Sequence, residues 1–333
     1  MKTLVTRSSR FSNASLVLLA VLIIALLAAP WWGGRAELRL LGEIYMYLSL
    51  ACLWNLMAGY AGLVSVGQQA YVGFGGYMLF AFTIYAGVHP VMAIIAGGVL
   101  AAVLSIPVAT LIFRLNGAYF AIGTWVVAEV FRLSFAQITA LGGGSGSSLP
   151  LNVVKSLAAS RSARESLSYY LAIGAMLLVF IAIYLLLRSK RGIALTAIRD
   201  NESAAAELGI NVWRTKLEIY VVTSALTAVV GGLIFLQKLR ISPEAAFSVN
   251  DWTAFVIFIV VIGGIGTLEG PIIGTIVFFL LRETLADFGT TYLMILGLVA
   301  IVVMIKAPGG LWGLISRKYD LEIFPLRYRV RQD

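Results

Sequence analysis

Residues 91–113 read VMAIIAGGVLAAVLSIPVATLIF, a run of 23 residues without a charged side chain. A helix of that length rises about 35 Å, enough to cross a bilayer core of about 30 Å. The sequence therefore predicts an all-α integral membrane protein, a polytopic bundle of about ten transmembrane helices. The two runs that flank Gly266 to Gly270 are short, which predicts tilted, broken or half-spanning helices. Besides 91–113, nine apolar runs lie at about 16–33, 40–58, 68–87, 117–138, 168–188, 215–237, 252–266, 271–286 and 290–306. The two short runs are 252–266 and 271–286.

The composition of the whole chain agrees with a membrane protein. Of its 333 residues 60% are hydrophobic and only 12% are charged, with a mean hydropathy of +0.93. A soluble domain carries about 25% charged residues because it must coat its surface, whereas lipid-facing helices need none. A cytoplasmic enzyme is therefore disfavoured. With one cysteine, Cys52, and one histidine, His89, we expect neither an internal disulfide nor a metal site, and no motif predicts a cofactor.

The net charge of +9 sets the predicted orientation and does not indicate a nucleic-acid partner. With the N-terminus inside, 16 of the 25 basic residues are cytoplasmic: Lys2, Arg7, Arg10, Arg114, six within 188–216, Lys306 and five within 317–331. We predict one transmembrane domain, residues 1–333, with both termini cytoplasmic. Its parts are a retained first span (16–33), an external loop (139–167), a cytoplasmic loop (188–214) and a cytoplasmic tail (307–333).

The cytoplasmic loop contains a short helix with readable ends. Asp200 or Asn201 suits the N-cap, an acidic residue follows in the first turn, and Gly209 suits the left-handed position after the helix. An exposed, alanine-rich helix offers a smooth surface that the cleft of another protein could approach; an ordinary solvated loop helix is the alternative. The candidate docking residues are Asp200, Asn201, Glu202, Ser203, Ala204, Ala205, Ala206, Glu207, Leu208 and Gly209.

No phosphate-binding loop, nucleophile elbow or paired-carboxylate motif is present in the sequence, so no catalytic residue is predicted. Charges inside spans are costly and therefore candidates for function. Glu129 and Arg132 lie three residues apart on one helix face, where they would either neutralise each other or line a translocation path.

Two glycine-dense segments, residues 59–76 and 263–271, are too interrupted for smooth helices. Non-helical backbone at membrane depth is tolerated where protein or a water-filled cavity surrounds it, so these segments are path candidates. Close packing is the alternative, since Gly266, Gly270 and Gly274 are spaced four apart. The similar composition of the segments 59–76 and 263–271 hints that the chain consists of two related halves. The path candidates are Asn55, Gly62, Ser65, Gly67 and Gln68, with Glu129 and Arg132.

Five segments together resemble one family, the LivM-like permease subunits of ABC importers for branched-chain and other hydrophobic amino acids. They are 55-NLMAGYAGLVSVGQQ-69, 117-GAYFAIGT-124 with Glu129 and Arg132, 142-GGGS-145, 197-AIRDNE-202 and 263-GGIGTLEGP-271. The resemblance implies a bacterial inner-membrane importer that also contains a second, LivH-like permease subunit, two cytoplasmic ATPases and an extracytoplasmic substrate-binding protein. This chain would then be no enzyme itself.

The resemblance also implies a role for the alanine-rich helix, as the coupling helix that docks into the ATPase. The spacing from Glu202 to Gly209 is one residue longer than usual, and alignment on Gly209 places Ser203 where the family has glutamate. The alternatives are a self-contained secondary amino-acid transporter, a permease for urea or short amides, and a membrane scaffold or channel. An unpaired series of membrane carboxylates would favour the secondary transporter, and the sequence lacks a clear one.

Overall fold

The computed structural model describes residues 3–6, 10–158, 160–285, 288, 291–319, 323–324 and 329–332. Of the basic residues counted above, Lys2, Arg7 and Arg327 lie outside this set. The main helices are α1 (Arg10–Leu27), α3 (Arg35–Asn55), α4 (Gln68–Tyr85), α5 (Pro90–Ile112), α6 (Ala118–Ala136), α8 (Arg161–Arg188), α11 (Val212–Lys238), α13 (Phe255–Gly263), α14 (Gly270–Thr284) and α15 (Thr291–Lys306). Shorter helices are α2 (Ala29–Trp32), α7 (Leu151–Leu157), α9 (Lys190–Asp200), α10 (Glu202–Glu207), α12 (Pro243–Ala246) and α16 (Gly310–Tyr319).

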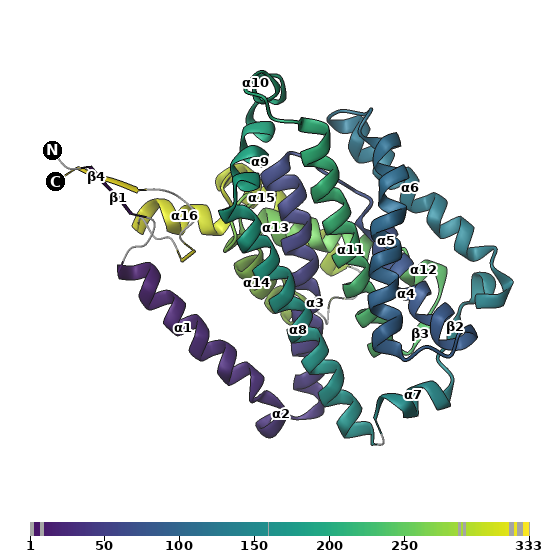
Figure 1. Cartoon of the computed structure of the whole chain (residues 1–333). Helices are drawn as coiled ribbons and strands as arrows, with labels where there is room; N and C mark the ends of the chain where they lie inside the picture. The colour runs from purple at the N-terminus through teal and green to yellow at the C-terminus, as the bar shows by residue number, and fades with distance from the viewer. Residues whose placement is uncertain are drawn as a thin grey trace.

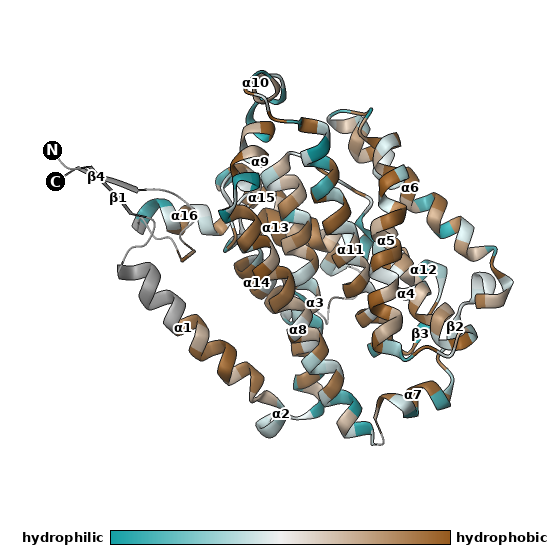
Figure 2. Cartoon of the chain, in the orientation of Figure 1, coloured by the Kyte–Doolittle hydropathy of each residue, from teal (hydrophilic) through white to brown (hydrophobic). Residues whose placement is uncertain are grey.

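Each of the ten predicted apolar runs holds one of the main helices, and hydrophobic residues predominate along them (Figure 2). Among the described residues, seven helical stretches are long and apolar enough to cross a membrane. Three of the main helices fall outside that set. The described apolar part of α1 covers only Leu18–Leu27, α14 has 15 residues, and α4 opens with two glutamines. The all-α bundle is confirmed, and ten full crossings is too strict a count.

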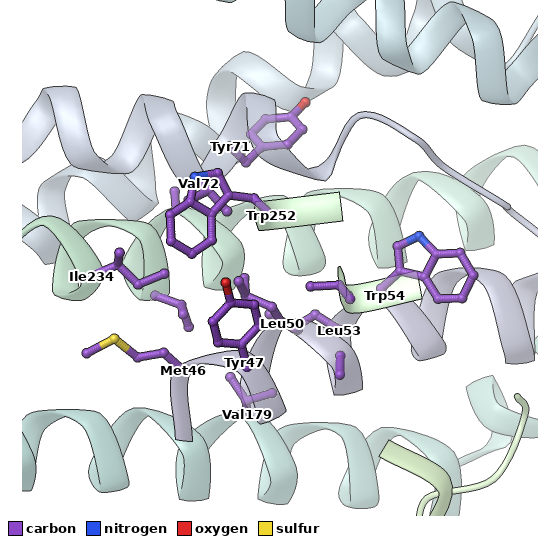
Figure 3. Packing of buried hydrophobic residues seen from close by; sticks show 14 of the residues in the cluster. Met46, Tyr47, Leu50, Leu53, Trp54, Tyr71, Val72, Val179, Ile234 and Trp252 are labelled. Carbon is purple, nitrogen blue, oxygen red and sulfur yellow. The ribbon is translucent and has the colours of Figure 1, made fainter. Parts of the chain in front are cut away.

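The centre of the bundle is α3, which packs against α8, α11, α13 and α14. Its buried face carries large apolar and aromatic side chains (Figure 3). The ring of Tyr47 stacks on Trp252 with centroids 5.9 Å apart, and it meets Phe279 of α14 edge-on at 5.7 Å. Such aromatic pairs contribute about 0.5–1.5 kcal/mol beyond the burial of their area. These contacts tie the first half of the chain to the second.

Helices α4 and α11 approach each other most closely, through glycine. A Cβ at Gly231 of α11 would lie 2.6 Å from the Cα of Val72, and a Cβ at Gly75 of α4 would lie 2.6 Å from the carbonyl carbon of Ala228. Each glycine therefore faces the backbone of the other helix. Small residues at both positions let two membrane helices come into backbone contact.

Several predicted boundaries are wrong. Helix α8 begins at Arg161, seven residues before the predicted span, because Ser160 caps it and Glu165 is neutralised by Arg39 at 2.6 Å. The predicted external loop is correspondingly shorter and contains α7. The first span ends at Leu27 instead of reaching Gly33, and the short α2 follows.

Two short strand pairs add to the helices. Strand β1 (Thr3–Thr6) pairs antiparallel with β4 (Arg329–Gln332), so these segments from the two ends of the chain lie side by side. Strand β2 (Ser147–Ser148) pairs with β3 (Arg240–Ile241) at the end of the bundle that carries α7.

Candidate functional site

Both glycine-dense segments contain an interruption, and the two interruptions lie against each other. The first is shorter than predicted, because residues 68–76 belong to the regular helix α4. In the first, α3 passes into a π-helical turn, η1 (Leu56–Tyr60), and the backbone stays non-helical over 62–67 before α4 begins. In the second, residues 264–269 separate α13 from α14. A Cβ at Gly59 would lie 2.5 Å from the backbone nitrogen of Gly266, so the two backbones are in direct contact. We call this contact the double break.

Asn55 links the two sides of the double break. Its Nδ2 donates a hydrogen bond to the Thr267 carbonyl at 2.7 Å, and its Oδ1 accepts one from the Gly266 amide at 2.8 Å. The residue is 1% exposed. Backbone groups outside a helix need such partners when water is absent. Asn55, a predicted path residue, lines none of the described cavities and instead holds the two interrupted segments together.

Close packing explains the second glycine segment, as its packing interpretation predicted, although with a different set of residues. The Cβ positions of Gly263 and Gly274 face backbone across the tight hairpin between α13 and α14. Gly266 does not belong to that contact, since it lies in the loop with φ of +76° and faces Gly59. Of the three glycines spaced four apart, Gly270 and Gly274 lie in the close contact, as predicted, and Gly266 does not.

Helix α10 departs from its prediction in two ways. It is preceded by a second helix, α9, which the sequence did not reveal, so Asp200 ends α9 and Asn201 alone caps α10, its Oδ1 accepting from the Ala204 amide at 3.0 Å. The alanines are not all exposed. Ala205 is 1% exposed because α10 folds back on α9 and α11, so this position faces inward. Gly209 follows with φ of +84°, as predicted.

The outward side of α10 combines small residues with one large apolar side chain. Ser203, Ala204, Ala206 and Glu207 are exposed, and Leu208 is 80% exposed. Glu202 instead pairs with Lys216 of α11 at 2.6 Å and thereby fastens the start of α10 to the bundle. Figure 1 shows α10 projecting at the opposite end of the molecule from α7.

Two cavities flank the double break at the α10 end. One, of about 910 Å³, lies between the first break, the turn from α5 to α6 and the α9–α10 segment, and Gly62 lines it. The other, of about 370 Å³, lies between the second break, α9 and α16. Arg199 lines both cavities.

Arg199 joins the candidate site although the sequence analysis did not single it out. Its Nη1 donates to the Gly59 carbonyl at 2.9 Å, while Nε and Nη2 donate to Asp200 Oδ1 at 3.0 and 2.9 Å. The signal was present: Arg199 is the basic residue directly before the capped helix, within the segment 197-AIRDNE-202.

Three of the predicted path residues, Ser65, Gly67 and Gln68, do come together. They line a small cavity of about 20 Å³ with hydroxyl-bearing residues of α4 and α11, among them Tyr71 and Thr223. Gln68 Nε2 donates to the Leu50 carbonyl at 2.9 Å, and its Oε1 has no hydrogen-bond partner among the described residues. That volume is enough for one water molecule and too small for an amino acid.

Glu129 and Arg132 form the predicted ion pair and lie apart from all three cavities. Arg132 Nη2 lies 2.5 Å from Glu129 Oε1, and the two side chains are 34% and 43% exposed, respectively. They lie on the outer surface of α6 and remain partly exposed in this chain.

Comparison with known proteins agrees with this architecture. Residues 37–305 match the family model for the permease component of the branched-chain amino acid transport system. The chain belongs to this permease family. The permease is 29% identical over 318 residues to the high-affinity branched-chain amino acid transport system permease protein LivM of Escherichia coli strain K12, covering 89% of this chain and 74% of that protein.

Two relatives from Methanocaldococcus jannaschii carry the names LivH and LivM. The permease is 29% identical over 154 residues to the LivH protein of Methanocaldococcus jannaschii, covering 43% of this chain and 47% of that one. It is 24% identical over 236 residues to the LivM protein of the same organism, covering 66% of each chain. No solved structure matches the permease.

Proposed function

We propose that the permease is the membrane subunit of an ATP-driven importer that carries branched-chain or other hydrophobic amino acids inward. Its proposed partners are a LivH-like second permease subunit, two ATPase subunits and an extracytoplasmic substrate-binding protein. The family match supports the transport function. The observation that carries the coupling role is α10, a capped helix that projects from the bundle with Leu208 exposed. A self-contained secondary transporter is not favoured by the family.

The α10 end of the bundle is proposed to face the cytoplasm of a bacterial cell, with the α7 end outside the inner membrane. The distribution of basic residues supports this orientation, since 16 of 25 fall on the α10 side of the predicted topology. The exposed segment then meets the ATPases, and the cavity of about 910 Å³ opens toward the cytoplasm.

The proposed docking face of α10 consists of Leu208 surrounded by Ser203, Ala204, Ala206 and Glu207. Small neighbours let a partner surface approach the helix backbone, and the leucine side chain fills an apolar pocket in it. A few central residues dominate the energy of most interfaces, and truncating one of them costs about 2 kcal/mol or more. Asp200, Asn201 and Glu202 are proposed to shape the helix, because each contacts this chain itself.

Leu208→Asp tests the docking role. Placing a carboxylate where an apolar anchor enters the partner is expected to weaken ATPase binding about 30-fold. We would measure how much ATPase co-purifies with the permease in mild detergent, and amino-acid uptake by cells. Leu208→Met keeps the apolar volume and is the matched control. Wild-type co-purification and uptake by Leu208→Asp would contradict the coupling assignment. A substitution at Ala205 would not test docking, because Ala205 is buried inside the permease.

We further propose that the outer surface of α6 faces the second permease subunit, with Glu129 and Arg132 beside the translocation path. A charge in the middle of a bilayer costs about 2.5–3.5 kcal/mol on insertion scales, so a protein surface is the better environment. Helix α5, by contrast, contains no charged residue, and most of its exposed side chains, such as Val103, are apolar.

A photoreactive group on a single cysteine tests this interface. In a Cys52→Ala background, Val130→Cys on α6 is expected to cross-link the second permease subunit. Val103→Cys, equally exposed on α5, is expected to give lipid adducts only. The reverse pattern would place the subunit interface on α5 and remove Glu129 and Arg132 from the path.

A further inference from the structure

Arg199 lies where three segments meet: the α9–α10 segment, the first break (η1 and residues 62–67) and the second break (residues 264–269). It is the penultimate residue of α9, two residues before the cap of α10. Its Nη1 reaches the Gly59 carbonyl in the π-helical turn that ends α3. The same nitrogen lies 3.4 Å from where a Cβ of Gly266 would be. One side chain thus touches three segments that are distant in the sequence.

The position of the Gly59 carbonyl explains why the positively charged guanidinium of Arg199 binds it. The last carbonyls of a helix have no partner within that helix, and their partial negative charge attracts cations. The end of the helix at the η1 turn leaves the Gly59 carbonyl in this condition, and Arg199 supplies a donor at 2.9 Å. The contact therefore stabilises the interrupted helix in its present geometry.

The planar shape of the Arg199 guanidinium lets it hold two partners in a fixed arrangement. Two of its nitrogens bind Asp200 Oδ1 while the third binds Gly59, so the planar group is held from both sides. A lysine ammonium is a single point on a flexible stem and does not hold two partners in one rigid plane. Asp200, exposed and without another ion-pair partner among the described residues, orients the group.

Arg199 also separates the two cavities at this end, of about 910 and 370 Å³. Helix α9 packs against α8, α11 and the η1 turn, which belongs to the double break. Within this packing, the Arg199 guanidinium forms a hydrogen bond from α9 to the Gly59 carbonyl of that turn. A displacement of α10 that moves α9 would therefore act on the interrupted helices at this contact.

We propose that Arg199 is the positioning residue that transmits the movement of the docking helix to the double break. Pulling α10 toward the ATPases moves α9 and Arg199, and the guanidinium carries the Gly59 turn with it. Asn55 then moves Gly266 and Thr267 together with Gly59. This inference rests on the proposed coupling function of α10 and names the residue through which that coupling passes.

Substitutions at Arg199 test the proposal in importer complexes reconstituted in proteoliposomes. Arg199→Ala and Arg199→Lys are both expected to lower amino-acid uptake about tenfold or more, the usual scale of a lost coupling. ATP hydrolysis continues in both, but the loaded binding protein no longer stimulates it. Arg191→Ala is the matched control, because Arg191 also lies on α9 yet pairs with Glu218 and not with the double break. Full uptake by Arg199→Ala, or rescue by Arg199→Lys, would overturn the proposal.

A covalent link provides a second and independent test. A Cβ at Gly62 would lie 3.8 Å from the Cβ of Arg199, which matches the usual Cβ separation in a disulfide. In a Cys52→Ala background, Gly62→Cys/Arg199→Cys is expected to be uncoupled when reduced and to regain uptake when oxidised. A merely stabilising arginine predicts no such redox-dependent recovery. Formation of the disulfide without recovery of uptake would exclude transmission at this point.

The two proposals fail in different ways. If the ATPases co-purify with Leu208→Asp as with wild type, α10 is not the docking helix and the coupling function fails. If Leu208→Asp loses the ATPases while Arg199→Ala keeps them and transports normally, docking stands and only the Arg199 inference fails. Arg199→Ala complexes that retain both ATPases but hydrolyse ATP without transport are the expected result.

Discussion

Asn55→Leu is expected to destabilise the permease by about 2–6 kcal/mol, because it leaves the Gly266 amide and the Thr267 carbonyl without partners. A backbone group that loses its hydrogen bond costs up to about 1–3 kcal/mol, and the full cost applies where water stays out; Asn55 is buried, while Gly266 and Thr267 are half-buried. Leucine has nearly the shape of asparagine, so the substitution removes the hydrogen bonds without opening a large cavity. The loss is a large fraction of the roughly 5–15 kcal/mol by which proteins are usually stable.

The measurement is the thermal midpoint of the detergent-solubilised permease, obtained from the amount of protein that stays monodisperse after heating. Asn152→Leu is the control, since Asn152 is exposed on α7 and no hydrogen bond of its side chain is described. We expect a clear drop for Asn55→Leu and little change for the control. Equal midpoints for the two variants would show that the double break does not depend on Asn55.

Gly231→Ala is expected to prevent α4 and α11 from packing. The added methyl group would lie 2.6 Å from the Cα of Val72, and backbone atoms cannot rotate away as the end of a side chain can. Overpacking a core costs about 1–3 kcal/mol and more where the backbone must move. The loss falls on the most extensive helix–helix contact among the described elements, so we expect little folded permease in the membrane.

Gly174→Ala in α8 is the matched control for that substitution, because nothing lies within 4 Å of its Cβ position. There the change should stabilise the helix by up to about 1 kcal/mol, through the better helix propensity of alanine. The readout is the yield and elution profile of a fluorescent fusion in detergent. Comparable yields for the two variants would contradict the close α4–α11 crossing.

Local patterns in the chain were sufficient for much of the architecture. A run such as 91–113 must be helical and buried in lipid, because unpaired backbone groups are too costly there. The capping of α10 by Asn201 and the turn at Gly209 were also local and were predicted. Helix α9 was not predicted because its segment is polar on average, with Lys190, Arg191, Arg199 and Asp200 among its 11 residues, and so resembled a loop.

The candidate site was predicted less well than the helices. Ser65, Gly67 and Gln68 share a cavity, but Asn55 does not reach it, and Glu129 and Arg132 lie on another surface. Which side of a short helix faces the bundle depends on what it packs against, so three adjacent alanines looked equivalent until Ala205 proved to be buried. Exposure of Leu208 could not be inferred from its hydrophobicity.

The sequence by itself determined that the permease is a helical membrane protein, where its helices lie and to which family it belongs. Those properties depend on hydropathy and capping over stretches of about 10–20 residues, which act on each segment separately. Only the tertiary structure decided that two glycine-rich interruptions more than 200 residues apart meet. It also decided that Asn55 joins them and that Arg199 ties them to the docking helix. These are polar contacts between distant segments, and their partners exist only once the apolar helices have packed.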